Sequence, residues 1–297
     1  MTGEAQAALL ADGRRLHLQH GPIDIVAEAF GSPPERQRAY RQAAARFRTI
    51  LAELVSELQL LRQPIGAAGL PVSGQVARRM VAAVRPHRAQ FITPMAAVAG
   101  AVADEVLEAM LAGRSLSRAY VNNGGDIALH IGPGEHLQAG LVANPDAPQL
   151  PNALQLDGTI ELDHAMPVRG LATSGWRGRS FSLGIADAVT VLAASAAEAD
   201  AAATLVANAV DCDHPAISRS PAKLLREDTD LGDLPVTVGV GPLPEAAIDQ
   251  ALAHGAVRAE TLRRAGLLFA ASLVLQGRTR LVGALATTQD LRAAARA

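Results

Sequence analysis

Two consecutive glycines between apolar segments constrain the fold of this chain more than any other feature. Asn123-Gly124-Gly125-Asp126 separates residues 119–122 from residues 127–131, and both flanking segments have the composition of β-strands. Such glycine-containing pairs are typical of tight hairpin turns, because glycine tolerates the positive φ angles that these turns require. The two segments are therefore predicted to pair as antiparallel strands.

The remaining pattern mixes strands and helices without a regular βαβ alternation. Strands are predicted at residues 14–19, 23–29, 137–143, 154–162, 180–183, 188–193, 236–240, 267–275 and 279–282, and helices at residues 35–62, 75–84, 93–111, 195–209, 244–253 and 259–264. Turn signals between strands favour antiparallel pairing, so the predicted class is α+β. We interpret residues 1–285 as a single domain, with a surface loop at 146–152 and a peripheral tail at 286–297.

Composition argues against several classes of partner. The chain has 27 Lys and Arg against 29 Asp and Glu, a net charge of −2, and only 3% aromatic residues, so neither a nucleic acid nor an anionic membrane is expected. Cys212 is the only cysteine, which excludes an intrachain disulfide and a cysteine-based zinc cluster. The apolar stretch 95–111 contains three acidic residues, and the N-terminus lacks a secretory pattern. A cytoplasmic protein with a small-molecule ligand is predicted.

The glycine turn itself has two interpretations. In the simpler one it only reverses the chain. In the other, Gly124 and Gly125 open the backbone to a ligand, Asn123 flanks it, and Asp126 accepts hydrogen bonds from a group such as a ribose. Asp126 is then a candidate catalytic residue as well as a ligand-binding one.

A second polar segment, Thr173-Ser174-Gly175, is either an ordinary loop or a cradle for phosphate oxygens. Hydroxyls and backbone N–H groups bind anionic oxygens, and Arg169 or Arg177 would supply positive charge. Asp187 follows this segment and is a candidate general base, with a role in capping a turn as the alternative.

A candidate metal site lies on the predicted helix 195–209, where Asp200 and Thr204 are four residues apart and share a face. Carboxylate and hydroxyl oxygens suit Mg²⁺. The alternative is an acidic residue placed near the helix start by the helix dipole. The segment from Asp211 to His214 has the residue types of a zinc site, but a solvated loop is favoured because the side chains have no distant partner.

Taken in order, these motifs resemble those of the ApbE-like superfamily of FAD:protein FMN transferases, over residues 90–210 and closest to a cytosolic branch. The segments that carry the resemblance are Asn122–Asp126, Thr173–Gly175, Ala199–Ala201 with Thr204, and Ala99-Gly100 through Asp104. The resemblance implies an ApbE-like fold of two interleaved lobes around a flavin site, with FAD or FMN as ligand. It also implies Mg²⁺ held by Asp200, Thr204 and the carbonyl of Ala96.

The chain departs from the transferases at two points. It has Ala99 where they have a lysine, and residues 176–187 contain neither histidine nor proline, whereas the transferases have a His-x-x-x-Pro segment there. Three hypotheses therefore stay open. The protein is an enzyme, either an FMN transferase relative or one acting on a small heterocycle such as a nicotinate derivative. Alternatively it binds flavin or nucleotide without catalysis. In the third, it is an assembly protein whose small-residue segment 95–102 packs a homodimer.

Overall fold

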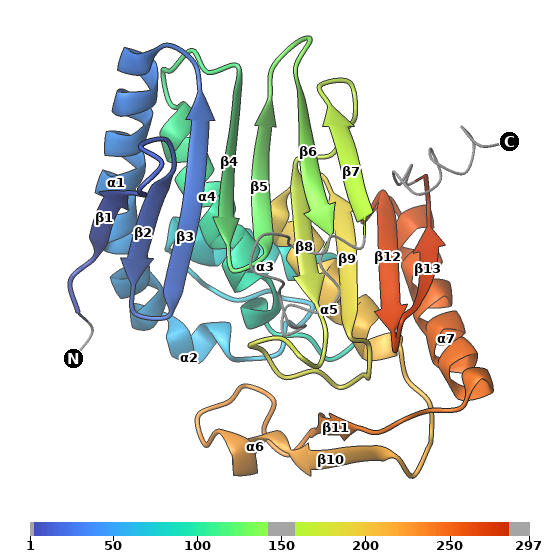
Figure 1. Ribbon diagram of the computed structural model, residues 1–297. Coiled ribbons are helices and arrows are strands. Elements are labelled where there is room, and N and C mark those ends of the chain that lie inside the picture. Colours follow the sequence, from blue (N-terminus) through green and yellow to red (C-terminus); the bar gives the residue numbers. More distant parts are fainter. Residues whose placement is uncertain (1–2, 142–157, 285–297) are drawn as a thin grey trace, which may run out of the picture. The chain divides into compact units, whose positions relative to one another are not determined.

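The computed structural model (Figure 1) describes residues 3–141 and 158–284. The chain divides into two compact units. Unit 1 comprises Met1–His136, Asp163–Ala172 and Ala193–Ala201, and unit 2 comprises Leu137–Leu162, Thr173–Leu192 and Ala202–Ala297. Segments of the two units alternate along the sequence, and α5 crosses from one unit to the other. The predicted loop at 146–152 and the predicted tail at 286–297 lie outside the described residues.

Unit 1 is built on an antiparallel sheet in the order β1-β2-β3-β4-β5-β8. Its strands are β1 (Gln6–Leu9), β2 (Leu16–His20), β3 (Ile23–Phe30), β4 (Arg118–Asn123), β5 (Asp126–Ile131) and the start of β8 (Gly170–Ser174). The β4–β5 pair is the hairpin predicted from the glycine turn, with Asn123 opposite Asp126. The antiparallel pairing and the accompanying helices confirm the α+β class.

Helices α1 and α4 pack against this sheet and against each other. The helices of unit 1 are α1 (Pro33–Ser56), α2 (Leu58–Leu61), α3 (Gln75–Val84), the 3-10 turns η1 (Arg85–His87) and η2 (Pro94–Ala97), α4 (Val98–Leu111) and the first residues of α5 (Ala196–Ala209). In α1 the residues Phe47, Ile50 and Leu54 recur at helical spacing and are buried. The N-terminal Pro33-Pro34 pair suits the first helical turn, where no backbone donor is needed.

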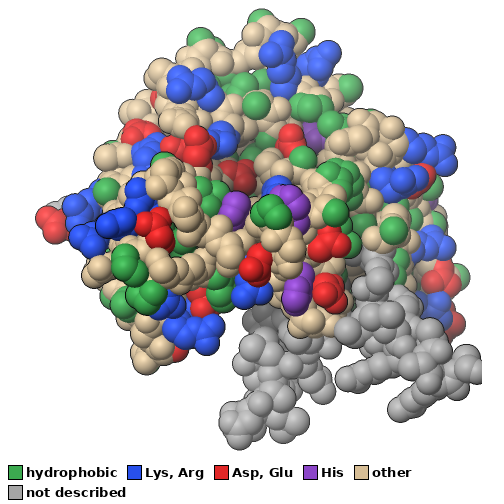
Figure 2. Space-filling view, turned by 90° about the horizontal axis from the view of Figure 1, so that it is seen from above, with side chains coloured by type: hydrophobic (Ala, Val, Ile, Leu, Met, Phe, Trp, Pro, Cys, Tyr) green, Lys and Arg blue, Asp and Glu red, His purple; other side chains and the backbone are tan. Residues whose placement is uncertain are grey.

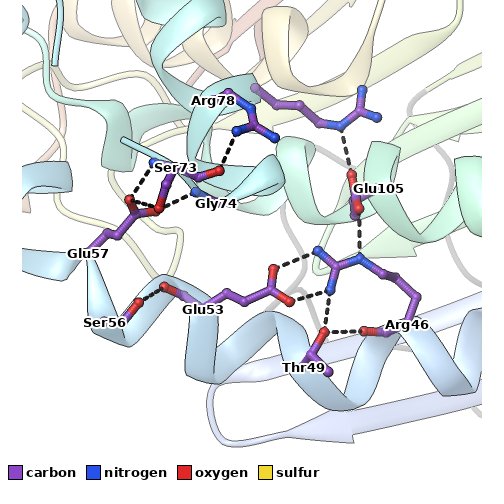
Figure 3. Close-up of polar contacts among 10 residues, drawn as sticks. Arg46, Thr49, Glu53, Ser56, Glu57, Ser73, Gly74, Arg78 and Glu105 are labelled. Atoms are coloured by element: carbon purple, nitrogen blue, oxygen red, sulfur yellow. Dashed lines mark hydrogen bonds and ion pairs between the residues drawn. The ribbon is translucent and has the colours of Figure 1, made fainter. Parts of the chain in front are cut away.

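The predicted helix 35–62 is interrupted at Glu57, where the backbone has φ −113° and ψ 8°. The Glu57 carboxylate accepts hydrogen bonds from the backbone N–H groups of Ser73 at 2.6 Å and Gly74 at 2.9 Å, just before α3 (Figure 3). It thereby satisfies donors at the start of another helix. This partner lies sixteen residues away in sequence, so local spacing could not reveal the interruption.

A buried carboxylate ties α4 to α1 and α3. Glu105 is 4% exposed and accepts hydrogen bonds from Arg46 Nε at 2.7 Å and Arg79 Nε at 3.0 Å. Arg46 also forms a two-point ion pair with Glu53 (Figure 3). Two guanidinium groups thus compensate the desolvation of one carboxylate, which is the condition for burying it.

Unit 2 contains shorter sheets and one long helix. Its strands are β6 (His136–Leu141) paired with β7 (Gly158–Asp163), β9 (Ala188–Ala193) followed by β12 (Ala270–Leu275) and β13 (Arg278–Val282), and β10 (Ile217–Pro221) paired with β11 (Pro235–Val240); its helices are α6 (Ala222–Leu225), α7 (Glu245–Arg264) and the remainder of α5. The pairs β9–β12, β12–β13 and β10–β11 are antiparallel. Helix α7 packs on β12 and β13.

Two predictions for unit 2 are wrong, one about helices and one about a strand. The two helices predicted at 244–253 and 259–264 are one helix, because α7 continues through Gly255. A Cβ at Gly255 would lie 2.3 Å from Val210 Cγ2, so the glycine serves close packing instead of ending the helix. Residues 180–183 do not form a strand. The N–H of Leu183 donates a hydrogen bond to Asn208 Oδ1 at 2.9 Å and not to a neighbouring strand.

The surface agrees with the balanced composition. Figure 2 shows Lys and Arg side chains interspersed with Asp and Glu on the face that it presents. Within the described residues, every helix is too short or too polar to cross a membrane.

We predict that Glu105→Gln destabilises the protein by about 3 kcal/mol, because it removes a charge from two partly buried guanidinium groups. Glu53→Gln removes a more exposed partner of Arg46 and should cost less than about 1 kcal/mol. Urea unfolding of both variants tests this. Equal losses would show that burial of Glu105 is unimportant.

We predict that Gly255→Ala is destabilising, although the same change in an open helix usually stabilises by about 1 kcal/mol. The added methyl group would overlap Val210 and Leu273. The second substitution Val210→Ala should relieve the overlap, so the double variant should lose less stability than the two single losses added together. Additive losses in thermal unfolding would contradict this account.

Candidate functional site

The glycine turn is a two-residue hairpin loop with a left-handed backbone. Gly124 has φ 66° and Gly125 has φ 109°, values that other residues rarely adopt. Asn122 Oδ1 accepts a hydrogen bond from Gly125 N at 2.8 Å, which holds the loop closed. Gly124 is exposed, and a Cβ at Gly125 would meet no atom within 4 Å. The glycines are therefore required by backbone conformation, and they leave open space beside the loop.

Asn123 connects this loop to the start of α4. Its side chain is 4% exposed, and its Nδ2 donates to the carbonyl of Ala99 at 3.0 Å. Ala99 is the second residue of α4, because the helix begins at Val98 after an N-cap at Ala97 with φ −130°. The hairpin loop and the N-terminus of α4 are thereby held together within unit 1.

The N-termini of α4 and α5 are capped by each other's carboxylates. Asp104 of α4 accepts the backbone N–H groups of Ala196 at 3.0 Å and Ala197 at 2.9 Å, at the start of α5. Asp200 of α5 accepts the N–H of Gly100, at the start of α4, at 3.0 Å. Each carboxylate satisfies donors that its partner helix leaves unbonded and interacts favourably with the positive end of its dipole.

Gly100 permits this contact. A Cβ there would lie 2.2 Å from the carbonyl oxygen of Ala196, so no other residue fits without moving a helix. Gly170 of β8 likewise permits a close approach to the start of α5. A Cβ added to Gly170 would lie 2.1 Å from the carbonyl carbon of Ser195. Ser195 also caps α5 itself, because its Oγ accepts the N–H of Glu198 at 3.2 Å.

Asp126 and Asp200 form a hydrogen-bonded pair of acids. Part of Asp200 still reaches solvent, but protein atoms surround its carboxyl group, and this burial raises the pKa of Asp200. The N–H groups of Gly100 and Ala99 and the contact with Asp126 act in the opposite direction. Two carboxylates in contact repel each other, so a proton or a cation between them stabilises the pair. Burial likewise raises the pKa of Asp104 to about 6.

The second predicted segment belongs to unit 2, where it is fixed by Asp187. Gly175 is buried, and a Cβ on it would lie 2.4 Å from the carbonyl oxygen of Asp187. The Asp187 carboxylate accepts hydrogen bonds from Trp176 Nε1 at 3.2 Å, Arg177 Nε at 3.0 Å and Gln276 N at 2.6 Å. Arg177 also stacks on the Trp176 ring, 4.6 Å from its centre.

The first two residues of the Thr173-Ser174-Gly175 segment lie closer to solvent than Gly175. Thr173 is exposed, and its Oγ1 is 2.9 Å from Thr190 Oγ1. Ser174 is half-buried. The segment thus presents hydroxyl groups on a backbone that Asp187 holds in place.

The predicted metal ligands have oxygen atoms of the right chemistry. Ala96 precedes the N-cap of α4, so its carbonyl lies outside the hydrogen-bond ladder of that helix. Thr204 follows Asp200 by one turn in α5 and is half-buried; the boundary between the units falls between them. No cluster of three or more His, Cys, Asp or Glu side chains suited to a metal occurs among the described residues, including the Asp211–His214 segment.

Sequence reasoning missed the roles of Asp104 and Asn123. Asp104 is the last residue of the Ala99-Gly100 through Asp104 motif, four residues after Gly100 on a helix of small side chains. This spacing is the signal for its role in the sequence. The partners of Asp104 lie more than ninety residues away, which no local pattern encodes.

Comparison with known proteins places these motifs in a family context. The family model described as AbpE bacteria matches residues 7–281. UPF0280 proteins of Methanopyrus kandleri and Methanoregula boonei are 36% identical over 141 residues and 30% identical over 220 residues. These matches cover 48% and 70% of this chain, respectively. The chain spans about half the length of the first relative, 52%, and 87% of the second.

Solved structures of flavin transferases also match. The apo flavinyl transferase ApbE of Pseudomonas stutzeri has 13% identity and a TM-score of 0.43, with 97% of this chain and 95% of that chain covered. A mutant of the flavin transferase ApbE from Vibrio cholerae has 12% identity and a TM-score of 0.42, with 98% and 99% covered.

We predict a distinct pH dependence of stability from Asp104. Because its pKa is raised from 3.8 to about 6, the folded state holds a proton more tightly than the unfolded state. The stabilisation that comes from protonated Asp104 in the folded state is complete below about pH 4 and is lost as the pH rises to about 6. The stability of the wild type relative to Asp104→Asn should therefore fall by about 2 kcal/mol across this window. Urea unfolding at several pH values measures it, and a constant difference would refute the shift.

Proposed function

Because this chain belongs to the family described as AbpE bacteria, we propose that it binds a flavin or a similar planar, nucleotide-like ligand together with Mg²⁺. The family membership bears out the resemblance to ApbE-like proteins, some of which are flavin transferases by name. The observation that supports the ligand and metal most directly is the acid pair Asp126–Asp200 beside the hairpin loop.

The acid pair fits a hard divalent cation. Asp200 accepts backbone N–H groups of α4 and contacts Asp126, and the contacts described for Asp200 include no cationic side chain. A carboxylate offers about four acceptor positions, and the N–H groups of Ala99 and Gly100 use only part of those on Asp200. A divalent cation in place of a proton would allow both Asp126 and Asp200 to be ionised, because its positive charge compensates the two carboxylates.

In this proposal Asp200, Thr204 and the carbonyl of Ala96 hold Mg²⁺, which would neutralise phosphate oxygens of the ligand. Gly124 and Gly125 allow the ligand to approach the backbone, since no side chain projects from the loop. Asp126, which contacts Asp200, orients the ligand. These assignments use only oxygen donors, in keeping with the preference of Mg²⁺.

Within unit 2, the Thr173-Ser174-Gly175 segment offers hydroxyl groups of the kind that bind anionic oxygens. Asp187 enters the proposal as the residue that fixes this segment, because three N–H groups already occupy its oxygens. A general base needs a lone pair directed at its substrate, and these contacts leave Asp187 poorly suited to that role.

Binding without flavin transfer is the second candidate function. Ala99 stands where the transferases have a lysine, and both backbone groups of Ala99 serve the contacts with Asn123 and Asp200. The chain thus keeps the framework of the site while it lacks a cationic side chain at that position. Turnover with FAD distinguishes the two functions.

We predict that MgCl₂ and FAD together raise the thermal unfolding temperature of the wild type. Asp200→Asn should abolish the part that depends on MgCl₂. Gly125→Val should weaken FAD binding by at least about ten-fold, because valine cannot adopt φ 109° without strain. Differential scanning calorimetry and quenching of FAD fluorescence provide the measurements.

Glu108→Gln is the control, since it removes an exposed carboxylate of α4 that pairs with Arg79 outside the site. Its response to both compounds should equal that of the wild type. No effect of MgCl₂ or FAD on the wild type, or an unchanged response in both Asp200→Asn and Gly125→Val, would rule the proposal out.

A further inference from the structure

Asp104 is a half-buried carboxylate that the proposed function does not use. It lies on α4, and its two oxygens accept the first two N–H groups of α5, those of Ala196 and Ala197. It is adjacent to Glu105, but the two side chains have different partners. Glu105 contacts arginines from α1 and α3, whereas Asp104 contacts the backbone of α5.

The contacts of Asp104 and Asp200 form a closed ring. Asp104 binds the N–H of Ala196, and Asp200 follows Ala196 by four residues, one turn along α5. Asp200 in turn binds the N–H of Gly100, and Asp104 follows Gly100 by four residues along α4. The ring therefore sets the axial position of α5 against α4. Because helices are stiff over one turn, that position determines where the Asp200 carboxylate lies.

We propose that Asp104 is a positioning residue for the cation site, acting through α5 to hold Asp200 at the N-terminus of α4. This inference rests on the proposed function, in which Asp200 is a cation ligand. Groups that orient metal ligands are worth about ten- to hundred-fold in metal affinity, because a ligand displaced by a fraction of an ångström no longer matches the geometry that the ion requires.

The helix itself does not depend on Asp104 alone. Ser195 Oγ also accepts an N–H at the start of α5, from Glu198 at 3.2 Å. Removal of the Asp104 carboxylate therefore leaves α5 with a cap, so the helix should persist. What is lost is the tie between the two helices. Gly100 packs against Ala196 without a side chain, so this contact supplies little resistance to sliding.

The test compares Mn²⁺ binding by the full chain, with MnCl₂ alone as the probe and electron paramagnetic resonance as the readout. Mn²⁺ shares the oxygen preference of Mg²⁺. Asp104→Asn should weaken Mn²⁺ binding about ten-fold or more. Glu105→Gln is the matched control: it neutralises the neighbouring carboxylate on α4, destabilises the protein by removing the partner of Arg46 and Arg79, and leaves the contacts of α5 untouched. Its affinity for Mn²⁺ should stay within about two-fold of the wild type.

Asp200→Asn separates the two ideas. If Asp200→Asn loses Mn²⁺ binding while Asp104→Asn retains it, the cation site stands and the positioning role is overturned. If Glu105→Gln loses affinity as much as Asp104→Asn, general destabilisation explains both and the positioning role is again overturned. If the wild type and Asp200→Asn bind alike, the proposed function fails and the inference fails with it. Should Asp104→Asn not fold, Asp104→Ser, which keeps one acceptor oxygen, is measured instead with the same expectations.

Discussion

The reciprocal capping of α4 and α5 is the interaction on which the candidate site depends. Each helix presents an aspartate that satisfies the N-terminal N–H groups of the other, and Gly100 lets the two backbones approach. Helix N-termini attract negative charge because several donors are unbonded there and the peptide dipoles point the same way. Here the chain supplies that charge twice from its own residues. The positions of Asp200, Ala99 and the hairpin loop all follow from this arrangement.

Unit 1 buries carboxylates in two chemically different ways. Glu105 is held by two guanidinium groups, so its charge is compensated and it links α1, α3 and α4. Asp104 and Asp200 accept backbone N–H groups, Asp200 also contacts Asp126, and burial raises the pKa values of Asp104 and Asp200. The first arrangement contributes to stability, whereas the second costs stability. Perturbed acids of this kind are concentrated at functional sites, and this favours a cation-binding interpretation.

In unit 2 the contacts of Asp187, a candidate general base, fix the loop next to it. Asp187 brings Trp176, Arg177 and Gln276 together and sets the conformation after Thr173-Ser174-Gly175. An aspartate after a glycine-rich loop suits either role on sequence grounds. The number of N–H groups directed at it distinguishes them, and that number depends on a strand connection almost ninety residues further on.

The sequence by itself determined the elements whose signals are local. The glycine pair predicted the β4–β5 hairpin, because the turn requires positive φ angles that glycine adopts easily. The hydroxyl of Ser195 caps the start of α5. These residues act on neighbours within a few positions, so their effect can be read from the chain. Only the tertiary structure decided that Glu57 interrupts a helix, that Gly255 does not, and that Asp104 caps α5. In each case the decisive partner is distant in sequence, and its position is set by packing that no local spacing encodes.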